Sequence, residues 1–393
     1  MVPVGLFLFS ESEEEEMITV KLWRENRGTV LKLPCTENEM ETALKRIRDN
    51  GTYPPEPLVA AILPKELSVL EDRYVNLDEL NYLAKRMESF NENELMKFYS
   101  VVAVERYAEM ENLIDLTFNL NCYTLIRDVS SLEAVGKTLM FDLQGGIREA
   151  AMTTEEYVAA GRELFASGAY TPTAYGLLHK NGLEMEQVYD GRVFPNYAYH
   201  ADWQLNIAIE YHGRTEYLFL PDENTAIQKA LYRLGASYPE ECQIRVEDAN
   251  LSDGEWSRYL EEVRKEEGLY ELNELMQAVD PGVTDMDKLL TVIRYAKAGN
   301  AVEVMRLAEH LDAFAFIPDA DNEWDVGREL YLNEFGRISE TLRDFFDFEA
   351  FGKAMIEKLG GEFIDGAGYV YLKGEKTLEE ILHPEEGFMI TEI

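Results

Sequence analysis

The sequence predicts an α+β protein built from two copies of one module. Four sequence blocks recur in the same order along the 393 residues, at offsets between 187 and 192 residues. Each copy opens with short runs of apolar and β-branched residues, which indicate strands. The segments that follow have apolar residues at three- and four-residue steps, which indicates amphipathic helices.

The repeated blocks define the length of the module. The matching stretches are 30–47 with 217–234, 77–83 with 269–275, 125–139 with 316–330, and 156–164 with 347–355. Leu33 and Pro34 match Leu220 and Pro221 in the first block, and Gly161 matches Gly352 in the last. A shared order at nearly constant offset indicates an internal duplication. The unit is about 170 residues long.

Each predicted module begins as a small strand-helix subdomain. In the first copy MITVKLW and GTVLKLP form the strand pair, and in the second LNIAIEY and TEYLFLP do so. A helix follows each pair, ENEMETALKRIRDNG and ENTAIQKALYRLG, with a Thr or Asn residue at its start as the expected cap.

The middle of each module is predicted to be helical and acidic. In residues 77–90 the apolar positions form a single stripe, while Asp78, Glu79 and Glu88 fall largely outside it. Each module then ends in a small helix-hairpin piece: YVAAGRELFASGAY before AYGLLH in the first copy, and FEAFGKAMIEKLGGEFIDGAGYVYL in the second. There a helix ends at glycine and a short strand or hairpin follows.

These elements give the expected domain boundaries. We expect an acidic N-terminal extension at 1–16, a first module at 17–185, an ordered connector at 186–202 and a second module at 203–393. The connector mixes Gly, Pro and Tyr and has too many aromatic residues for a flexible linker. The extension ends in a glutamate run, typical of a translated ribosome-binding site, so we expect translation to start at Met17.

The charge of the chain limits its partners. It has 75 Asp and Glu against 37 Lys and Arg, a net charge of -38. Residues 1–200 hold 33 acids and 19 bases, and residues 201–393 hold 42 and 18. Nucleic acids are bound through Lys and Arg that displace counterions, so direct nucleic-acid binding is not expected. An acidic protein instead attracts basic surfaces; solubility or adaptation to high salt is the alternative explanation.

Cysteine use and hydropathy indicate a cytoplasmic protein. Cys35, Cys122 and Cys242 are odd in number and widely spaced, so neither a disulfide framework nor a thiolate zinc site is predicted. No apolar run approaches the roughly 20 residues that cross a bilayer. The apolar start of the chain lacks a basic region and a cleavage site, so a signal peptide is not indicated.

No motif predicts catalysis, a cofactor or a metal. VGKT at 135–138 has Ser131 where a phosphate-binding loop needs glycine, so helix packing is the expected role. DADNEWD at 319–325 resembles a calcium loop, but Trp324 replaces the turn glycine and Leu330 the bidentate glutamate. The five histidines show no ligand spacing, and no nucleophile elbow is present.

Three stretches resemble a known family. LDELNYLAKRMESF at 77–90, ENLIDLTFNLNCYTLI at 111–126 and the aromatic-rich segment 347–371 resemble the ArdA antirestriction proteins of conjugative elements and phages. The resemblance covers nearly the whole chain after Met17. The chain departs from the family's usual form because it is a tandem, and because it has Asn273-Glu274 where the family has an Asn-Tyr pair.

The resemblance implies a function and a shape. ArdA proteins are elongated, acidic dimers that mimic B-form DNA and occupy the DNA channel of type I restriction-modification enzymes. It therefore implies an elongated tandem of two ArdA-like modules, without enzyme activity, in the cytoplasm of a bacterial host. The tandem would replace the family's dimer or dimerise further. A net charge of -38 equals that of roughly 19 base pairs, on the order of 60 Å of duplex.

The expected partner-binding surface consists of acids in two stretches. Residues 240–287 are the densest, with 15 acids and four bases. The candidate residues are Asp78, Glu79, Glu88, Glu92, Glu94, Glu105, Glu109, Glu111 and Asp115 in the first copy, and Glu240, Glu241, Glu247, Asp248, Asp253, Glu255, Glu261, Glu262, Glu266, Glu267, Glu271 and Glu274 in the second. For any one of them alone a solvated helix face is the favoured explanation, so the prediction concerns the array.

Two other functions fit the sequence. The first keeps the mimicry but directs it at another DNA-binding defence system, such as a CRISPR effector. The second, from a different class, is a hydrolase with a carboxylate dyad, which would need a concave pocket and a pair of raised pKa values.

Overall fold

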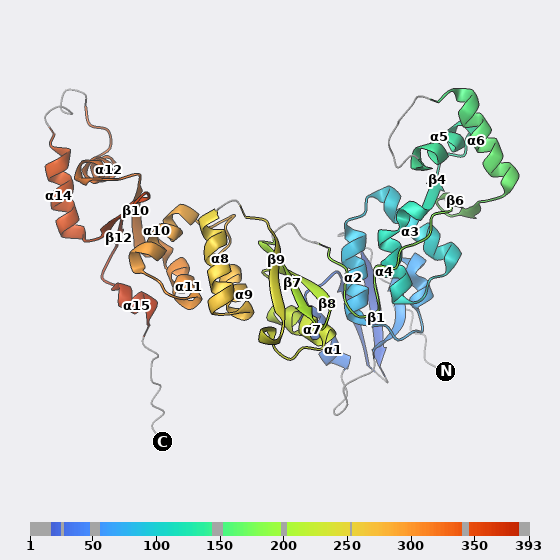
Figure 1. Ribbon diagram of the computed structural model, residues 1–393, viewed down its shortest axis with the longest axis horizontal. Helices are drawn as coiled ribbons and strands as arrows, with labels where there is room; N and C mark the ends of the chain where they lie inside the picture. Colours follow the sequence, from blue (N-terminus) through green and yellow to red (C-terminus); the bar gives the residue numbers. More distant parts are fainter. Residues whose placement is uncertain are drawn as a thin grey trace, which may run out of the picture. The chain divides into compact units, whose positions relative to one another are not determined.

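The computed structural model describes residues 17–24, 27–47, 56–143, 152–197, 203–251, 254–339 and 346–384. Of these residues, 51% lie in helices and 20% in strands, and the strands form small antiparallel sheets, so the predicted α+β class is confirmed. The chain divides into two compact units, Met1–Ala201 and Asp202–Ile393 (Figure 1). In the described ranges, no helix is both long and apolar enough to cross a membrane. The predicted acidic extension, 1–16, lies outside the described residues.

Unit 1 begins with a three-stranded sheet of order β2-β1-β3. Its elements are β1 (Ile18–Arg24), β2 (Arg27–Leu33), α1 (Glu37–Ile47) and β3 (Leu58–Leu63). The side chains of β1 alternate between the core and the outer face, as the period-two pattern requires. The strand pair and the helix agree with the predicted subdomain. The third strand, LVAAIL, was not predicted, because a short apolar run does not distinguish strand from helix.

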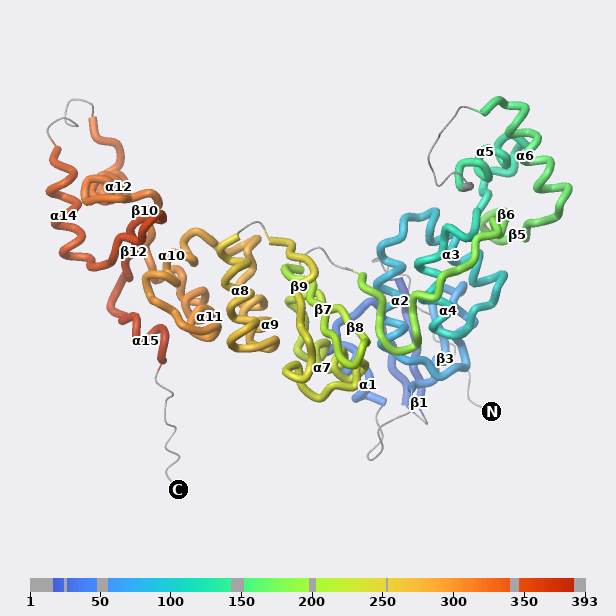
Figure 2. The backbone as a smooth tube through the Cα atoms, viewed as in Figure 1, coloured from blue at the N-terminus to red at the C-terminus, as the bar shows by residue number. Residues whose placement is uncertain are grey.

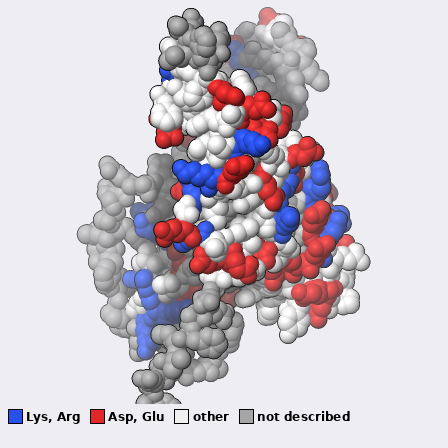
Figure 3. Space-filling view, turned by 90° about the vertical axis from the view of Figure 1, so that its left-hand side faces the viewer, with Lys and Arg blue, Asp and Glu red and all other residues white. Residues whose placement is uncertain are grey.

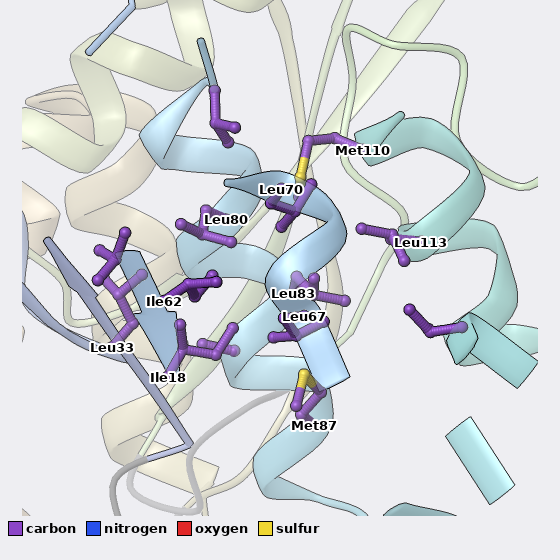
Figure 4. Packing of buried hydrophobic residues seen from close by; sticks show 14 of the residues in the cluster. Ile18, Leu33, Ile62, Leu67, Leu70, Leu80, Leu83, Met87, Met110 and Leu113 are labelled. Carbon is purple, nitrogen blue, oxygen red and sulfur yellow. The ribbon is translucent and has the colours of Figure 1, made fainter. Parts of the chain in front are cut away.

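Helices form the middle of unit 1 and close its core. They are η1 (Lys65–Leu70), α2 (Leu77–Glu88), α3 (Glu92–Glu105), α4 (Met110–Phe118) and η2 (Leu120–Cys122). The predicted stripe of α2 is buried: Leu80, Leu83 and Met87 pack with Ile18 and Ile62 of the sheet (Figure 4). This continuous apolar core fixes the side of each helix that faces solvent.

A small helix-hairpin piece ends unit 1. It consists of β4 (Tyr123–Ile126), α5 (Leu132–Leu143), α6 (Thr154–Ser167), β5 (Thr171–Thr173) and β6 (Gly176–Lys180), with sheet order β4-β6-β5. Helices α5 and α6 cross at Gly136 and Gly161. A Cβ at these positions would overlap the backbone carbonyl oxygens of Tyr157 and Leu132. The glycine of VGKT therefore permits close helix packing, which confirms the structural interpretation of that motif.

Unit 2 largely repeats the order of elements, although helix α8 takes the place that η1 has in unit 1. Its first sheet has the order β8-β7-β9. The elements are β7 (Leu205–Tyr211), β8 (Arg214–Leu220), α7 (Asn224–Leu234), η3 (Pro239–Glu241), β9 (Gln243–Ala249), α8 (Gly254–Glu266), α9 (Leu269–Ala278), α10 (Met286–Ala296) and α11 (Ala301–Glu309). The third strand of this sheet was also not predicted. α9 holds the repeat of α2, and it ends before the VDPG sequence.

The end of unit 2 also matches that of unit 1. It contains η4 (Leu311–Ala313), β10 (Phe314–Pro318), α12 (Glu323–Phe335), α14 (Phe348–Leu359), β11 (Glu362–Ile364), β12 (Gly368–Leu372) and α15 (Leu378–Leu382), with sheet order β10-β12-β11. α12 and α14 cross at Gly327 and Gly352, where a Cβ would overlap the carbonyl oxygens of Phe348 and Glu323. The same contact thus occurs at the same place in both units.

A buried asparagine explains why the α2 sequence recurs in α9. The Asn81 side chain accepts from the Cys35 N–H and donates to the Cys35 carbonyl, both at 2.9 Å. Asn273 makes the same two bonds to Asp222, at 2.9 and 2.7 Å. Each amide satisfies the backbone of the turn between the strand pair and the first helix. The Asn of LNYL and LNEL is therefore structural.

The described part of the predicted connector, 186–197, packs on unit 1. Figure 2 shows this segment running back along α2 after β6. The ring of Phe194 stacks on Tyr82 at 4.6 Å, and the Tyr82 hydroxyl donates to the Pro195 carbonyl at 2.9 Å. The guanidinium of Arg86 lies 4.0 Å from the ring centre of Tyr197. We call residues 186–197 the strap.

Candidate functional site

In unit 2 the predicted acids lie on four consecutive elements. Glu240 and Glu241 are in η3, Glu247 and Asp248 in β9, Glu255, Glu261, Glu262 and Glu266 in α8, Glu267 directly after α8, and Glu271 and Glu274 in α9. Asp253 lies outside the described residues. The stretch with the highest density of acids therefore folds into a short 3-10 helix, an edge strand and two packed helices. Each acid can be assessed by what it contacts.

Some of these carboxylates serve the fold. Glu267 accepts from the N–H of Ala301 at 3.0 Å and so caps the start of α11. Glu261 accepts two bonds of 2.8 Å from Arg264, and this pairing lowers its pKa to about 2. Glu247 pairs with Arg245 on β9. Carboxylates with local partners have less charge to offer a ligand.

Other acids of unit 2 are exposed. Glu240, Glu262 and Glu266 form no ion pair within the described ranges. Glu255, also exposed, forms an ion pair with Arg294 at 3.8 Å. Glu255, Glu262 and Glu266 are seven and four residues apart, so they share one face of α8. The opposite face, with Trp256, Leu260 and Val263, is buried and holds the helix in place.

In unit 1 the structure corrects one predicted surface residue. Asp115 is buried, with 8% of its surface exposed. One carboxylate oxygen accepts from the N–H groups of Val188 and Tyr189 in the strap, at 2.9 and 2.8 Å. Asp115 therefore holds the strap and does not present its charge to a partner. In unit 2 the equivalent position, 191 residues later, is occupied by a base, Arg306. Its guanidinium donates to the carbonyl of Leu382.

The strap also engages Glu79. The hydroxyl of Tyr189 donates to its carboxylate at 2.8 Å. Burial raises the pKa of Glu79, the bond from Tyr189 opposes this shift, and nearby Glu56, Glu111 and Asp78 add to it. Glu79 and Asp78 are half-buried in the first turn of α2. Glu79 therefore lies against the strap.

The remaining predicted acids of unit 1 divide in the same way. Glu94 forms the capping box of α3 with Asn91, Glu109 pairs with Arg73 at 3.0 Å, and Glu92 lies 3.9 Å from Arg127. Glu105 is exposed and lies 3.4 Å from the hydroxyl of Tyr123. Glu88 and Glu111 are exposed and form no ion pair with any described residue. Among the predicted acids that the structure describes, those that are exposed and form no ion pair are thus fewer in unit 1 than in unit 2.

Several exposed acids were missed by the sequence prediction. Glu155 and Glu163 on α6, and Glu349 and Glu357 on α14, are exposed on the terminal pieces. The eight-residue steps of both pairs, near two helical turns, could have indicated a common helix face. Figure 3 shows one face of the molecule, on which Lys and Arg side chains are interspersed among the acids. The acids available to a partner are therefore indicated by the absence of a basic neighbour rather than by the net charge.

The described residues offer no assembled metal site. Among them, no group of three or more His, Cys, Asp or Glu side chains is placed to hold an ion. The cysteines are free thiols, and burial raises the pKa of Cys122 and Cys242.

Comparisons with known proteins identify no relative. The chain matches no model of a protein family, and a search of curated proteins finds no significant similarity.

Proposed function

We propose that the protein inhibits a DNA-binding defence enzyme, a type I restriction-modification complex, by occupying its DNA channel with acidic surfaces. Its two units are copies of one ArdA-like module arranged in tandem. The proposal is supported by the sequence resemblance and by the shared order of elements, with the same glycine crossing and the same buried asparagine in both units.

The observation that carries the proposal is the acidic face of α8. Glu255, Glu262 and Glu266 project from a helix whose other face is anchored in the core. Side chains on a rigid helix keep a fixed spacing, which a disordered acidic tail cannot do. Lys and Arg side chains that line a DNA channel can then pair with several carboxylates at once and release counterions, as they do with phosphates.

The two modules differ in how many candidate acids are available to a partner. In unit 1 the strap engages Glu79 and Asp115, two of the nine candidate acids there. In unit 2 the position of Tyr82 is taken by Glu274, which is exposed. Unit 2 also has the larger net negative charge. Unit 2 therefore makes the stronger contact with the basic channel.

The test is inhibition of DNA cleavage by a purified type I enzyme. The triple variant E255Q/E262Q/E266Q removes three charges from α8 without changing side-chain length. We expect it to need a roughly tenfold higher concentration for half-inhibition, since exposed pairs contribute weakly but together. The control, E155Q/E163Q/E357Q, removes three exposed charges from the terminal pieces. Equal potency of the two variants and the parent would refute the α8 contact.

The target is tested separately. Binding to the type I enzyme should weaken steeply between 50 and 200 mM salt, as phosphate contacts do. A binding affinity that does not change with ionic strength would rule out the electrostatic mechanism. Binding to a CRISPR effector, with none to the type I enzyme, would retain the mimicry and change the target.

A further inference from the structure

Among the described residues, no strand pairs with the outer edge of β9 in unit 2. The sheet order β8-β7-β9 places β9 at an edge, paired with β7 alone. The carbonyl of Ile244 accepts from the guanidinium of Arg264 at 3.1 Å, so it points away from β7. Backbone groups alternate in direction along an antiparallel strand. The N–H and carbonyl of Val246, two residues on, therefore face the same open side.

The corresponding edge of unit 1 is covered by the chain itself. The N–H of Val59 in β3 donates to the Arg73 carbonyl, and the N–H of Asp72 donates to the Val59 carbonyl, both at 2.8 Å. A bridge joins Leu58 to Tyr74. Unit 1 thus shows that an extended segment fits at this position of the sheet. In unit 2 the segment that follows β9 is helical, and in the described ranges it bonds to the edge only through Arg264.

Acids outnumber bases near the open edge. Glu240 and Glu241 directly before β9, and Glu247 and Asp248 on it, are exposed, while the two bases there, Arg245 and Arg264, pair with Glu247 and Glu261. An unprotected edge attracts extended peptides through main-chain hydrogen bonds, and the flanking charges select among them. Here the selection favours a segment that carries Lys or Arg.

We propose that the β9 edge binds an extended, Lys- or Arg-bearing segment of a partner protein, which adds to the sheet as a fourth strand. This goes beyond DNA mimicry, because it requires a peptide backbone in the partner and acts at a site separate from the acidic face of α8. A partner protein can therefore be held at β9 whether or not its DNA channel is occupied.

The test uses the full chain and a fluorescein-labelled peptide of eight alternating lysine and valine residues. The variant Val246→Pro removes the outward N–H and leaves the bonds to β7 intact, since that N–H does not face β7. Val246→Thr is the matched control, because it keeps both the N–H and the β-branched shape. We expect peptide affinity, measured by fluorescence anisotropy, to fall at least roughly tenfold in Val246→Pro and to be unchanged in Val246→Thr.

Two further measurements complete the test. A peptide N-methylated at alternate residues on its pairing edge should lose affinity for the unaltered protein, which checks the mechanism without any folding risk. A glutamate-valine peptide should not bind. Equal affinity of Val246→Pro and the parent, or of the methylated and plain peptides, would overturn the proposal. So would conversion of a dimer to a monomer by Val246→Pro in sedimentation, since the occupant would then be a second copy of the chain.

Discussion

Replacement of Asp115 distinguishes a structural carboxylate from a partner-binding one. Asp115 accepts two N–H bonds from the strap while buried in α4. Asp115→Ala leaves both strap N–H groups without their acceptor. A bond to a charged group contributes about 1.5–3 kcal/mol, and the two share one oxygen, so we expect a loss of about 3 kcal/mol.

Hydrogen-deuterium exchange measures this loss where it occurs. A change of about 3 kcal/mol makes local opening of the strap roughly 100-fold more frequent. The amides of Val188 and Tyr189 should exchange faster by that factor, while unit 2 keeps its protection. Asp115→Asn, which retains an oxygen at the same place, should lose much less. Glu163→Gln, which changes an exposed acid on α6 of the same unit, should have no effect.

The opposite pattern would refute this reasoning. If Asp115→Ala left exchange in the strap unchanged and weakened target binding instead, Asp115 would belong to the partner-binding surface as the sequence first suggested. Equal exchange in Asp115→Ala and Glu163→Gln would show that the hydrogen bonds to the strap contribute nothing.

Three further predictions concern unit 2. Asn273→Ala removes the two bonds to the backbone of Asp222, and urea unfolding should show a loss of about 2–4 kcal/mol. Gly352→Ala forces α12 and α14 apart and should cost at least about 2 kcal/mol, although alanine favours helices. Because its pairing with Arg264 depresses the pKa of Glu261 from 4.5 to about 2, the stability from this pair is present above pH 4.5 and is lost as the pH falls toward 2. An acid titration of Glu261→Gln should lack that part of the loss.

Matched controls accompany these variants. Glu262→Ala alters an exposed acid on α8 that forms no ion pair with a described residue, and it should leave the unfolding midpoint unchanged. Gly254→Ala adds a Cβ into open space at the start of α8, so it should be neutral or slightly stabilising. A stable Gly352→Ala variant, or a Gly254→Ala variant as damaged as it, would contradict the packing argument.

The sequence predicted those features that depend on local spacing. The stripe of α2, the strand pairs and the glycine of VGKT follow from periodicity and from a comparison of the repeats, which identified Gly136 with Gly327. The third strand of the first sheet in each unit, β3 or β9, was missed. LVAAIL is too short for its period to distinguish strand from helix, and QIRVEDA is polar enough to resemble a loop.

Features that depend on distant contacts could not be predicted. The partners of Asp115 lie 73 and 74 residues further along the chain, so nothing near it shows that its charge is used internally. The same holds for Glu267, which caps a helix that starts 34 residues later. Charge density along the sequence therefore located the acidic region but did not separate structural carboxylates from free ones.

The most direct test of the central claim is competition for the DNA channel. A labelled DNA duplex is bound to a purified type I enzyme, and the protein is added at constant salt while DNA binding is followed by anisotropy. The apparent Kd for DNA should rise linearly with protein concentration, with no complex that contains both. A stable ternary complex of enzyme, DNA and this protein would contradict the account.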